Sequence, residues 1–236
     1  MNMKVNMILA QDKKNGIGNR GKLPWPLCKD DMSLFKKLTV GLGIQVANVN
    51  HTGSVSSFTQ ETSYSNAVIM GYNTWKSLPV RHRPLLNRMN IVLSNSHYDE
   101  LVNECEMLKY HNLLVFKSWF DIKQYLNPNL NDIGHSGDET YAFGDKLIPK
   151  YKEVWIIGGA EIYKSAFEQL HISQIYRTVF KKEYECDTFI DVYDLIKKKY
   201  HDKCEKSNVF DIIRTTLQEN DDYVMECLEV KEWIVS

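Results

Sequence analysis

The stretch EVWIIGGAEIYKSAFEQ, residues 153–169, decides the fold because two different patterns meet in it at a pair of glycines. EVWIIGG (153–159) predicts a strand that runs into paired glycines, because its apolar run at 154–157 is typical of a buried strand. From Ala160 onward the apolar residues recur at helical spacing. The glycines between them suit a tight strand-to-helix turn, and they equally suit a seat for a pyrophosphate at the helix N-terminus. A strand that leads directly into a helix is typical of α/β proteins.

Other parts of the chain repeat this alternation. Apolar runs predict strands over 5–11, 66–71, 89–94, 113–116 and 174–180, and helical spacing predicts helices over 29–40, 73–78 and 118–126. Near the C-terminus, VFDIIRTTLQ (209–218) and YVMECLEV (223–230) flank ENDD and predict a hairpin. The sequence thus predicts an α/β fold with a central mixed, mostly parallel sheet of about eight strands, flanking helices and a C-terminal antiparallel hairpin.

No clear linker or repeat divides the chain, so residues 1–236 are expected to form a single domain. Two stretches, near 41–65 and 128–150, are rich in small and polar residues and are longer than ordinary connections. Both are expected to be surface insertions.

Composition and charge argue against several classes of function. A formal net charge of -1 gives no basic excess for nucleic acid or an anionic membrane. The five cysteines form no CxxC pair and the seven histidines form no HExxH motif, so neither a disulfide framework nor a metal site is expected. The apolar run at the start is too short for a signal sequence or a membrane span. These features predict a cytoplasmic protein with free thiols.

The helix at 29–40 carries one residue that does not fit its surroundings. Asp31 lies on the face that otherwise presents Leu34, Phe35 and Leu38. An acidic residue in the first turn suits the helix dipole, and that is the only role expected of the aspartate before it. A carboxylate buried among apolar side chains needs a partner, which a cationic or amidine-like ligand group would supply. The pattern alone leaves both roles of Asp31 open.

Further motifs also allow a structural and a functional interpretation. The loop NGIGNRGKLPWP (15–26) follows a strand but lacks the GxGxxG spacing, and its Trp25 suits a packing anchor. GYNTW (71–75) is a second strand-to-helix turn, so two helix N-termini could share one diphosphate. Arg88 suits either an exposed surface or a carboxylate clamp. Thr178 lies in a strand, where β-propensity alone would explain it.

Taken in order, these motifs resemble those of dihydrofolate reductases. GIG with LPW, then DMSLF, VIMGYNTWKSLP, RPLLNRMNIVLS, WIIGGAEIY and YRTVF follow the order and spacing of that family. The resemblance covers most of the chain outside the two insertions. The Asp-Met pair and the insertions are most similar to protozoan enzymes of apicomplexan type, in which the reductase is often fused to thymidylate synthase. A fused or associated thymidylate synthase is therefore an implied partner.

The resemblance implies hydride transfer from NADPH to 7,8-dihydrofolate, giving 5,6,7,8-tetrahydrofolate for one-carbon metabolism and thymidylate synthesis. Asp31 would bind the pterin amino group and the adjacent ring nitrogen, and its charge would favour the protonated pterin while water delivers the proton. Trp25 would hold a water near the pterin, and Thr178 would bond to the Asp31 carboxylate. Antifolate inhibitors of the diaminopyrimidine class would bind as cations at the same aspartate.

Other positions carry over one by one from the resemblance. The implied substrate pocket consists of Ile8, Leu9, Asp31, Met32, Phe35, Leu78, Pro79, Leu85, Arg88, Ile157, Tyr163 and Thr178, with the arginine as the clamp on the glutamate carboxylate. The implied cofactor site consists of Ala10, Ile17, Gly18, Tyr72, Asn73, Thr74, Ser77, Ser94, Asn95, Lys117, Gly158, Gly159, Ala160, Glu161, Ile162 and Tyr163. The Gly-Gly bond would be cis, and the 15–26 loop would close over the nicotinamide.

The chain departs from the family at the expected site of the 2′-phosphate. Tyr72 and Asn95 stand where basic residues are common, and Lys117 is the one basic residue that matches there. NADPH is still the expected cofactor. Two other functions compete with the reductase: a pterin- or nucleotide-binding protein without turnover, and a pyrimidine reductase of riboflavin synthesis. The first would lose the acidic group or the glycine pair, and the second is expected to lack the LPW loop and the Asp-Met pair.

Overall fold

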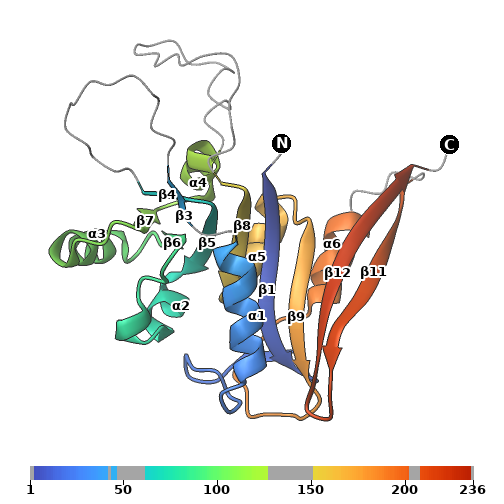
Figure 1. Ribbon diagram of the computed structural model, residues 1–236. Coiled ribbons are helices and arrows are strands. Elements are labelled where there is room, and N and C mark those ends of the chain that lie inside the picture. Colours follow the sequence, from blue (N-terminus) through green and yellow to red (C-terminus); the bar gives the residue numbers. More distant parts are fainter. Residues whose placement is uncertain (1–2, 42–43, 47–61, 127–150, 202–207, 235–236) are drawn as a thin grey trace.

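The computed structural model describes residues 3–41, 44–46, 62–126, 151–201 and 208–234. Its centre is an eight-stranded sheet (Figure 1). The strands are β1 (Lys4–Asp12), β5 (Asn66–Gly71), β6 (Met89–Leu93), β7 (Leu113–Phe116), β8 (Glu153–Gly158), β9 (Gln174–Phe180), β11 (Asn208–Glu219) and β12 (Tyr223–Ile234). They lie side by side in the order β11-β12-β9-β1-β8-β5-β6-β7.

The sheet is mixed and mostly parallel. Each neighbouring pair from β9 to β7 is parallel, whereas β12 is antiparallel both to β9 and to β11. The predicted fold class and the C-terminal hairpin are therefore confirmed. All six residues of β5 are buried, which explains why this strand appears in the sequence as a continuous apolar run.

Helices cover both faces of the sheet. They are α1 (Lys29–Val40), α2 (Tyr72–Ser77), α3 (Tyr98–Leu108), α4 (Trp119–Leu126), α5 (Ala160–Gln169) and α6 (Val192–His201), and a short 3-10 helix, η1, spans Val80–His82. Figure 1 shows α1 across one face of the sheet and α5 across the other. The alternation of side chains along each strand places the core residues of the two faces in different clusters. Val68, Met70 and Trp75 belong to the cluster on the α1 side, and Ile69, Ile122 and Ala166 belong to the other.

Two short antiparallel ribbons accompany the main sheet. In one, β2 (Gly16–Gly18) pairs with β10 (Thr188–Phe189). In the other, β3 (Ile44–Val46) pairs with β4 (Thr62–Tyr64) near the ends of the first predicted insertion. The middle of that insertion, and the second insertion up to residue 150, lie outside the described residues. The single-domain organisation stays a prediction.

The order of the strands creates a switch point beside β1. From β1 the chain passes through α1 to β5, on one side, and later returns through β8 and α5 to β9, on the other. In open α/β sheets, ligands bind outside the carboxyl ends of the strands at such a reversal. The carboxyl ends of β1, β8 and β9 are therefore the place to look for a site.

The described residues also bear on three expectations, which concern the cysteines, metal sites and membrane-spanning helices. Cys28, Cys105, Cys186 and Cys227 are free thiols, whereas Cys204 lies outside the described residues. Within the described ranges, no group of three or more His, Cys, Asp or Glu side chains is arranged to hold a metal ion. In the same ranges, no helix has the length and apolarity that crossing a bilayer requires.

Candidate functional site

Asp31 and Thr178 meet at the switch point. Asp31 lies in the first turn of α1, and Thr178 is buried in β9. The Thr178 hydroxyl donates a hydrogen bond of 2.7 Å to Oδ1 of Asp31, across 147 positions of sequence. Burial raises the pKa of Asp31, and the hydrogen bond from Thr178 lowers it by a smaller amount. The resemblance-based pairing of these two residues is thus present in the structure.

The side chains around Asp31 are apolar, as the helix pattern predicted. Phe35 and Leu38 pack against the cluster of Ile8 and Trp155, whereas Leu34 packs against the cluster of Trp25. The aspartate before it, Asp30, differs from the expectation of a dipole role alone. Its carboxylate accepts hydrogen bonds from Tyr223 and from Gln218, and it thereby ties α1 to the C-terminal hairpin.

Trp25 is a packing anchor, as its sequence context indicated. It is 6% exposed, and its ring centroid lies 4.7 Å from that of Phe180 and 5.9 Å from that of Tyr184. Ala10 and Cys28 pack against the same cluster. The tryptophan therefore fixes the end of the 15–26 loop against β9 and the segment after it.

Tyr163 contacts both β1 and the glycine pair. The Tyr163 hydroxyl is buried and donates a 2.8 Å hydrogen bond to the main-chain oxygen of Ile8. Burial is the main reason why the pKa of Tyr163 lies well above its ordinary value, so the phenol is a neutral donor. The Gly158–Gly159 bond is cis, as expected. A Cβ on Gly158, whose φ is +113°, would lie 3.0 Å from the Tyr163 oxygen, so only glycine fits.

Arg88 is buried, so the exposed-surface interpretation is wrong for this residue. It is 5% exposed, although it lies in a turn before β6. Its guanidinium donates to Oγ1 of Thr39 in α1 and, over 3.0 Å, to the main-chain oxygen of Leu86, and it lies 5.7 Å from the ring centroid of Phe35. Burial lowers the pKa of Arg88 to about 10, so the group is still a cation at neutral pH.

No carboxylate in the described part of the chain forms an ion pair with Arg88. A buried cation with neutral partners alone can bind an anionic ligand group. Thr39 carried no sequence signal. It is fully buried one turn after Phe35, and its hydroxyl oxygen accepts the hydrogen bond from Arg88.

The residues predicted to bind the diphosphate of the cofactor lie at the starts of α2 and α5, which follow β5 and β8. A Cβ built on Gly159, the residue before α5, would lie 3.4 Å from Oγ1 of Thr74 in α2. A Cβ on Gly71, the residue before α2, would come within 2.9 Å of Cγ1 of Ile162. The first turns of α2 and α5 are thus in contact, and glycine lets them approach. The first N–H groups of a helix have no intrahelical partner, so two helix N-termini in contact can share one anionic ligand group.

The residues predicted to lie near the 2′-phosphate follow the ends of β5, β6 and β7. Tyr72 stacks on His97 with ring centroids 3.7 Å apart, and the main-chain N–H of His97 donates to Oγ of Ser94 over 3.2 Å. Nζ of Lys117 lies 4.5 Å from the ring centroid of Tyr98. His97 carried no sequence signal, because its neighbours form no motif.

The remaining predicted residues occupy three kinds of position. The side chain of Leu9 packs in the cluster on the α5 side, so only its main chain can reach the pocket. The half-buried residues are Ile17, Gly18, Leu78, Leu85, Ile157, Ala160 and Ile162. The exposed residues are Met32, Asn73, Ser77, Pro79, Asn95, Lys117 and Glu161.

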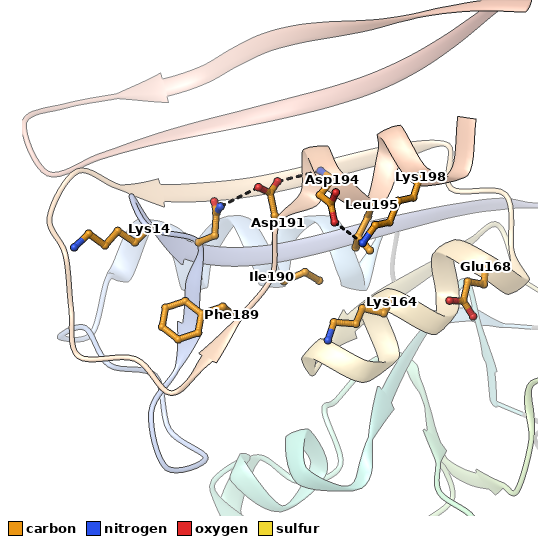
Figure 2. Close-up of a pocket in the computed structure, with 10 residues that line it drawn as sticks. Lys14, Lys164, Glu168, Phe189, Ile190, Asp191, Asp194, Leu195 and Lys198 are labelled. Atoms are coloured by element: carbon orange, nitrogen blue, oxygen red, sulfur yellow. Dashed lines mark hydrogen bonds and ion pairs between the residues drawn. The ribbon is translucent and has the colours of Figure 1, made fainter. Parts of the chain in front are cut away.

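A surface pocket of about 340 Å³ lies elsewhere, between α5, α6 and the β2–β10 ribbon (Figure 2). Lysines line it, but Lys14 pairs with Glu183, Lys164 with Glu161 and Lys198 with Asp194. This pocket contains none of the predicted site residues. Asp31 and its surroundings remain the candidate site.

Comparison with known proteins agrees with this geometry. A family model described as "Dihydrofolate reductase" matches residues 53–126 and 121–218. The chain is 32% identical to a dihydrofolate reductase of Sus scrofa, over 85% of this chain and 86% of that protein. It is 31% identical to a viral dihydrofolate reductase of Saimiriine herpesvirus 2, over 81% of this chain and 70% of the viral protein.

A plant protein completes the comparison. The chain is 29% identical to a bifunctional dihydrofolate reductase-thymidylate synthase of Daucus carota, over 80% of this chain but 28% of the plant protein. The likeness to protozoan enzymes stays a prediction, since these relatives are mammalian, viral and plant proteins. The matched family model, the extent of the mammalian match and the Asp31–Thr178 pair lead to one conclusion: the chain belongs to the dihydrofolate reductase family.

Proposed function

We propose that the protein reduces 7,8-dihydrofolate to 5,6,7,8-tetrahydrofolate with NADPH, and thereby supports one-carbon metabolism and thymidylate synthesis. The observation that carries this proposal is the half-buried Asp31 carboxylate, which accepts a hydrogen bond from Thr178 and is surrounded by apolar side chains. Because a carboxylate has about four acceptor sites, its two oxygens can also accept from an amino group and a ring N–H in a bidentate arrangement, which a pterin offers.

The chain's own residues would prepare the substrate for reduction. Asp31 orients the pterin, and its negative charge favours protonation of the imine nitrogen that the reaction saturates, while water delivers the proton. Phe35 and Ile8 exclude bulk water from the ring, which strengthens this electrostatic effect. Arg88 holds the glutamate carboxylate of the substrate tail.

The residues present also fit a dinucleotide. The first turns of α2 and α5, with Thr74 and Gly159 in contact distance, offer main-chain N–H groups to a diphosphate. Ala10, Ile17 and Gly18 border the place of the nicotinamide and its ribose. NADPH, when bound there, supplies the hydride. Lys117 and Ser94 are the groups available to its 2′-phosphate.

The direct test follows absorbance at the NADPH wavelength with dihydrofolate as substrate. Oxidation is expected with NADPH, and slower oxidation is expected with NADH at the same concentration. A well-folded protein that binds NADPH and dihydrofolate but consumes neither would contradict the proposal. The protein would then be a pterin- or nucleotide-binding protein without turnover. No activity on dihydrofolate but activity on a pyrimidine precursor of riboflavin would favour the related pyrimidine reductase.

Thr178→Val is expected to raise the pH at which antifolate binding begins to weaken as the solution is made more acidic. The hydroxyl bond favours the charged form of Asp31, so its loss raises the pKa of that carboxyl further. A cationic diaminopyrimidine needs the carboxylate, and protonation of Asp31 would then begin to weaken binding at a higher pH than in the wild type. Calorimetric titrations between pH 4 and about 8 would measure antifolate affinity as a function of pH. Thr216→Val, at an exposed position of β11, is the control; equal pH profiles for all three proteins would contradict the role of the hydroxyl.

A further inference from the structure

Asp12, the last residue of β1, has a carboxylate that the proposed reaction does not use. The residue is 1% exposed. The lysines next to it in the chain, Lys13 and Lys14, pair with Glu183 instead. Its oxygens accept from three main-chain N–H groups: Oδ1 from Lys14 at 2.9 Å and from Gly16 at 2.8 Å, and Oδ2 from Tyr184 at 2.9 Å. Hydrogen bonds to a buried carboxylate are strong and hold their donors in place.

These donors belong to two segments far apart in the sequence. One is the 14–18 loop, which follows β1, and the other is the 181–191 segment, which follows β9. The same two segments pair as β2 and β10, and the main-chain N–H of Ile190 donates to the oxygen of Asn15 over 2.9 Å. The Asn15 amide also donates to Asp191 over 3.3 Å, and Figure 2 labels Asp191 and Ile190 of the second segment. Asp12 is the buried group that touches both segments at once.

The packing around Gly16 leaves no room for a side chain at that position. A Cβ on Gly16 would overlap Sγ of Cys186 and would lie 2.7 Å from its Cβ and 3.1 Å from Oδ1 of Asp12. The thiol also lies 3.9 Å from Oδ2 of Asp12. Gly16 is therefore clamped between the carboxylate and the 181–191 segment, and the residues that follow it take their position from this contact.

We infer that Asp12 is a positioning residue for the cofactor. By fixing the 14–18 loop against the 181–191 segment, it places Ile17 and Gly18 where they border the nicotinamide and its ribose. The inference rests on the proposed function, because it needs a nicotinamide cofactor at this loop. A residue that merely stabilised the fold would affect both ligands alike, whereas a positioning residue affects the cofactor and spares dihydrofolate.

Asp12→Asn tests this directly. The amide can replace one oxygen, but its NH2 group then faces an N–H donor, so one of the two segments loses its hydrogen bond to residue 12. We expect binding of NADPH, measured by calorimetry, to weaken about tenfold, as for loss of one hydrogen bond to a charged group. Dihydrofolate binding is expected to change by less than about twofold, and Glu185→Gln, which removes an exposed charge in the same segment, should change neither.

Three outcomes would overturn the inference. Unchanged NADPH binding by Asp12→Asn would overturn it while leaving the proposed function intact. Equal weakening of both ligands would show a general role in folding. Failure of the wild type to bind NADPH would overturn the proposed function, and this inference with it.

A second pair of variants works even if Asp12→Asn folds poorly. Gly16→Ala is expected to weaken NADPH binding because its methyl group displaces Cys186 and separates the two segments. Gly16→Ala combined with Cys186→Gly removes the overlapping atoms, and NADPH affinity is expected to recover to within about twofold of the Cys186→Gly single variant. Recovery supports the contact as the positioning device, and a double variant that stays as weak as Gly16→Ala would overturn it.

Discussion

Asp31→Asn is expected to lower turnover of dihydrofolate at neutral pH by about 100-fold or more, which is the range for losing a group that assists proton transfer. The amide keeps the shape of the side chain and can still accept from Thr178. It loses the charge that favours the protonated pterin, so the effect should fall on kcat more than on NADPH binding. Steady-state kinetics at saturating NADPH would measure it.

The same variant should not lose stability. Burial raises the pKa of Asp31 above the value in the unfolded chain, so the folded protein binds that proton more tightly. Stability from this group is therefore present at low pH and declines as pH rises from the ordinary aspartate pKa to the raised one. Above that window Asp31→Asn removes the cost of a buried charge, and urea unfolding at neutral pH should show equal or greater stability.

Asp30→Asn is the matched control for both measurements. It changes the same chemical group one residue earlier, where the carboxylate faces Tyr223 and Gln218 rather than Thr178. This control should keep turnover and should lose rather than gain stability. A wild-type rate in Asp31→Asn would remove the carboxylate from the mechanism.

Arg88→Met is expected to weaken dihydrofolate binding by at least about 30-fold, or about 2 kcal/mol, because it removes one partner of a desolvated charge pair. Methionine retains apolar packing against Phe35 but provides no donor for a carboxylate. A dihydropterin without the glutamate tail should bind the variant and the wild type equally. The difference between the two ligands, measured by fluorescence titration, isolates the carboxylate contact.

Arg81→Met offers a matched control, since Arg81 is exposed in η1 a few residues earlier. It should affect neither ligand. If Arg88→Met weakened the tail-less pterin as much as dihydrofolate, the arginine would be shaping the pocket rather than binding the tail.

Local patterns in the sequence predict the elements that the sheet buries. The helix at 29–40 has the bounds that the structure shows, because its apolar face and the prolines before it are both local signals. The helices α3 and α6 escaped prediction, although each has a buried apolar face. In α6, Val192, Ile196 and Tyr200 recur every four positions and lie in the core, and in α3 Leu101 is fully buried. The two-residue strand β10 is formed by its pairing with β2, which no local pattern encodes.

The same distinction applies to the site. Asp31 could be found because a carboxylate interrupts an apolar face of one helix. Arg88 could not be judged from its neighbours, since the partner that explains its burial, Thr39, belongs to another element 49 positions away. Asp12 lies between the strand predicted over 5–11 and the loop over 15–26 and carried no sequence signal, because its three donors are main-chain groups that leave no trace in residue types. Resemblance to a family supplied the pairing of Asp31 with Thr178, which spacing alone left open.

The central place of β1 has a consequence for synthesis of the chain. The first strand pairs with β8 and β9, which are made some 150 to 170 positions later, whereas β5, β6 and β7 can pair with one another as soon as they emerge. During synthesis on a ribosome, where domains form from the N-terminus onward, β1 and α1 therefore keep their apolar surface exposed until β8 and β9 have been made. Chaperone dependence of the nascent protein should end only when β9 leaves the exit tunnel, and Asp31 acquires its threonine partner at that same moment.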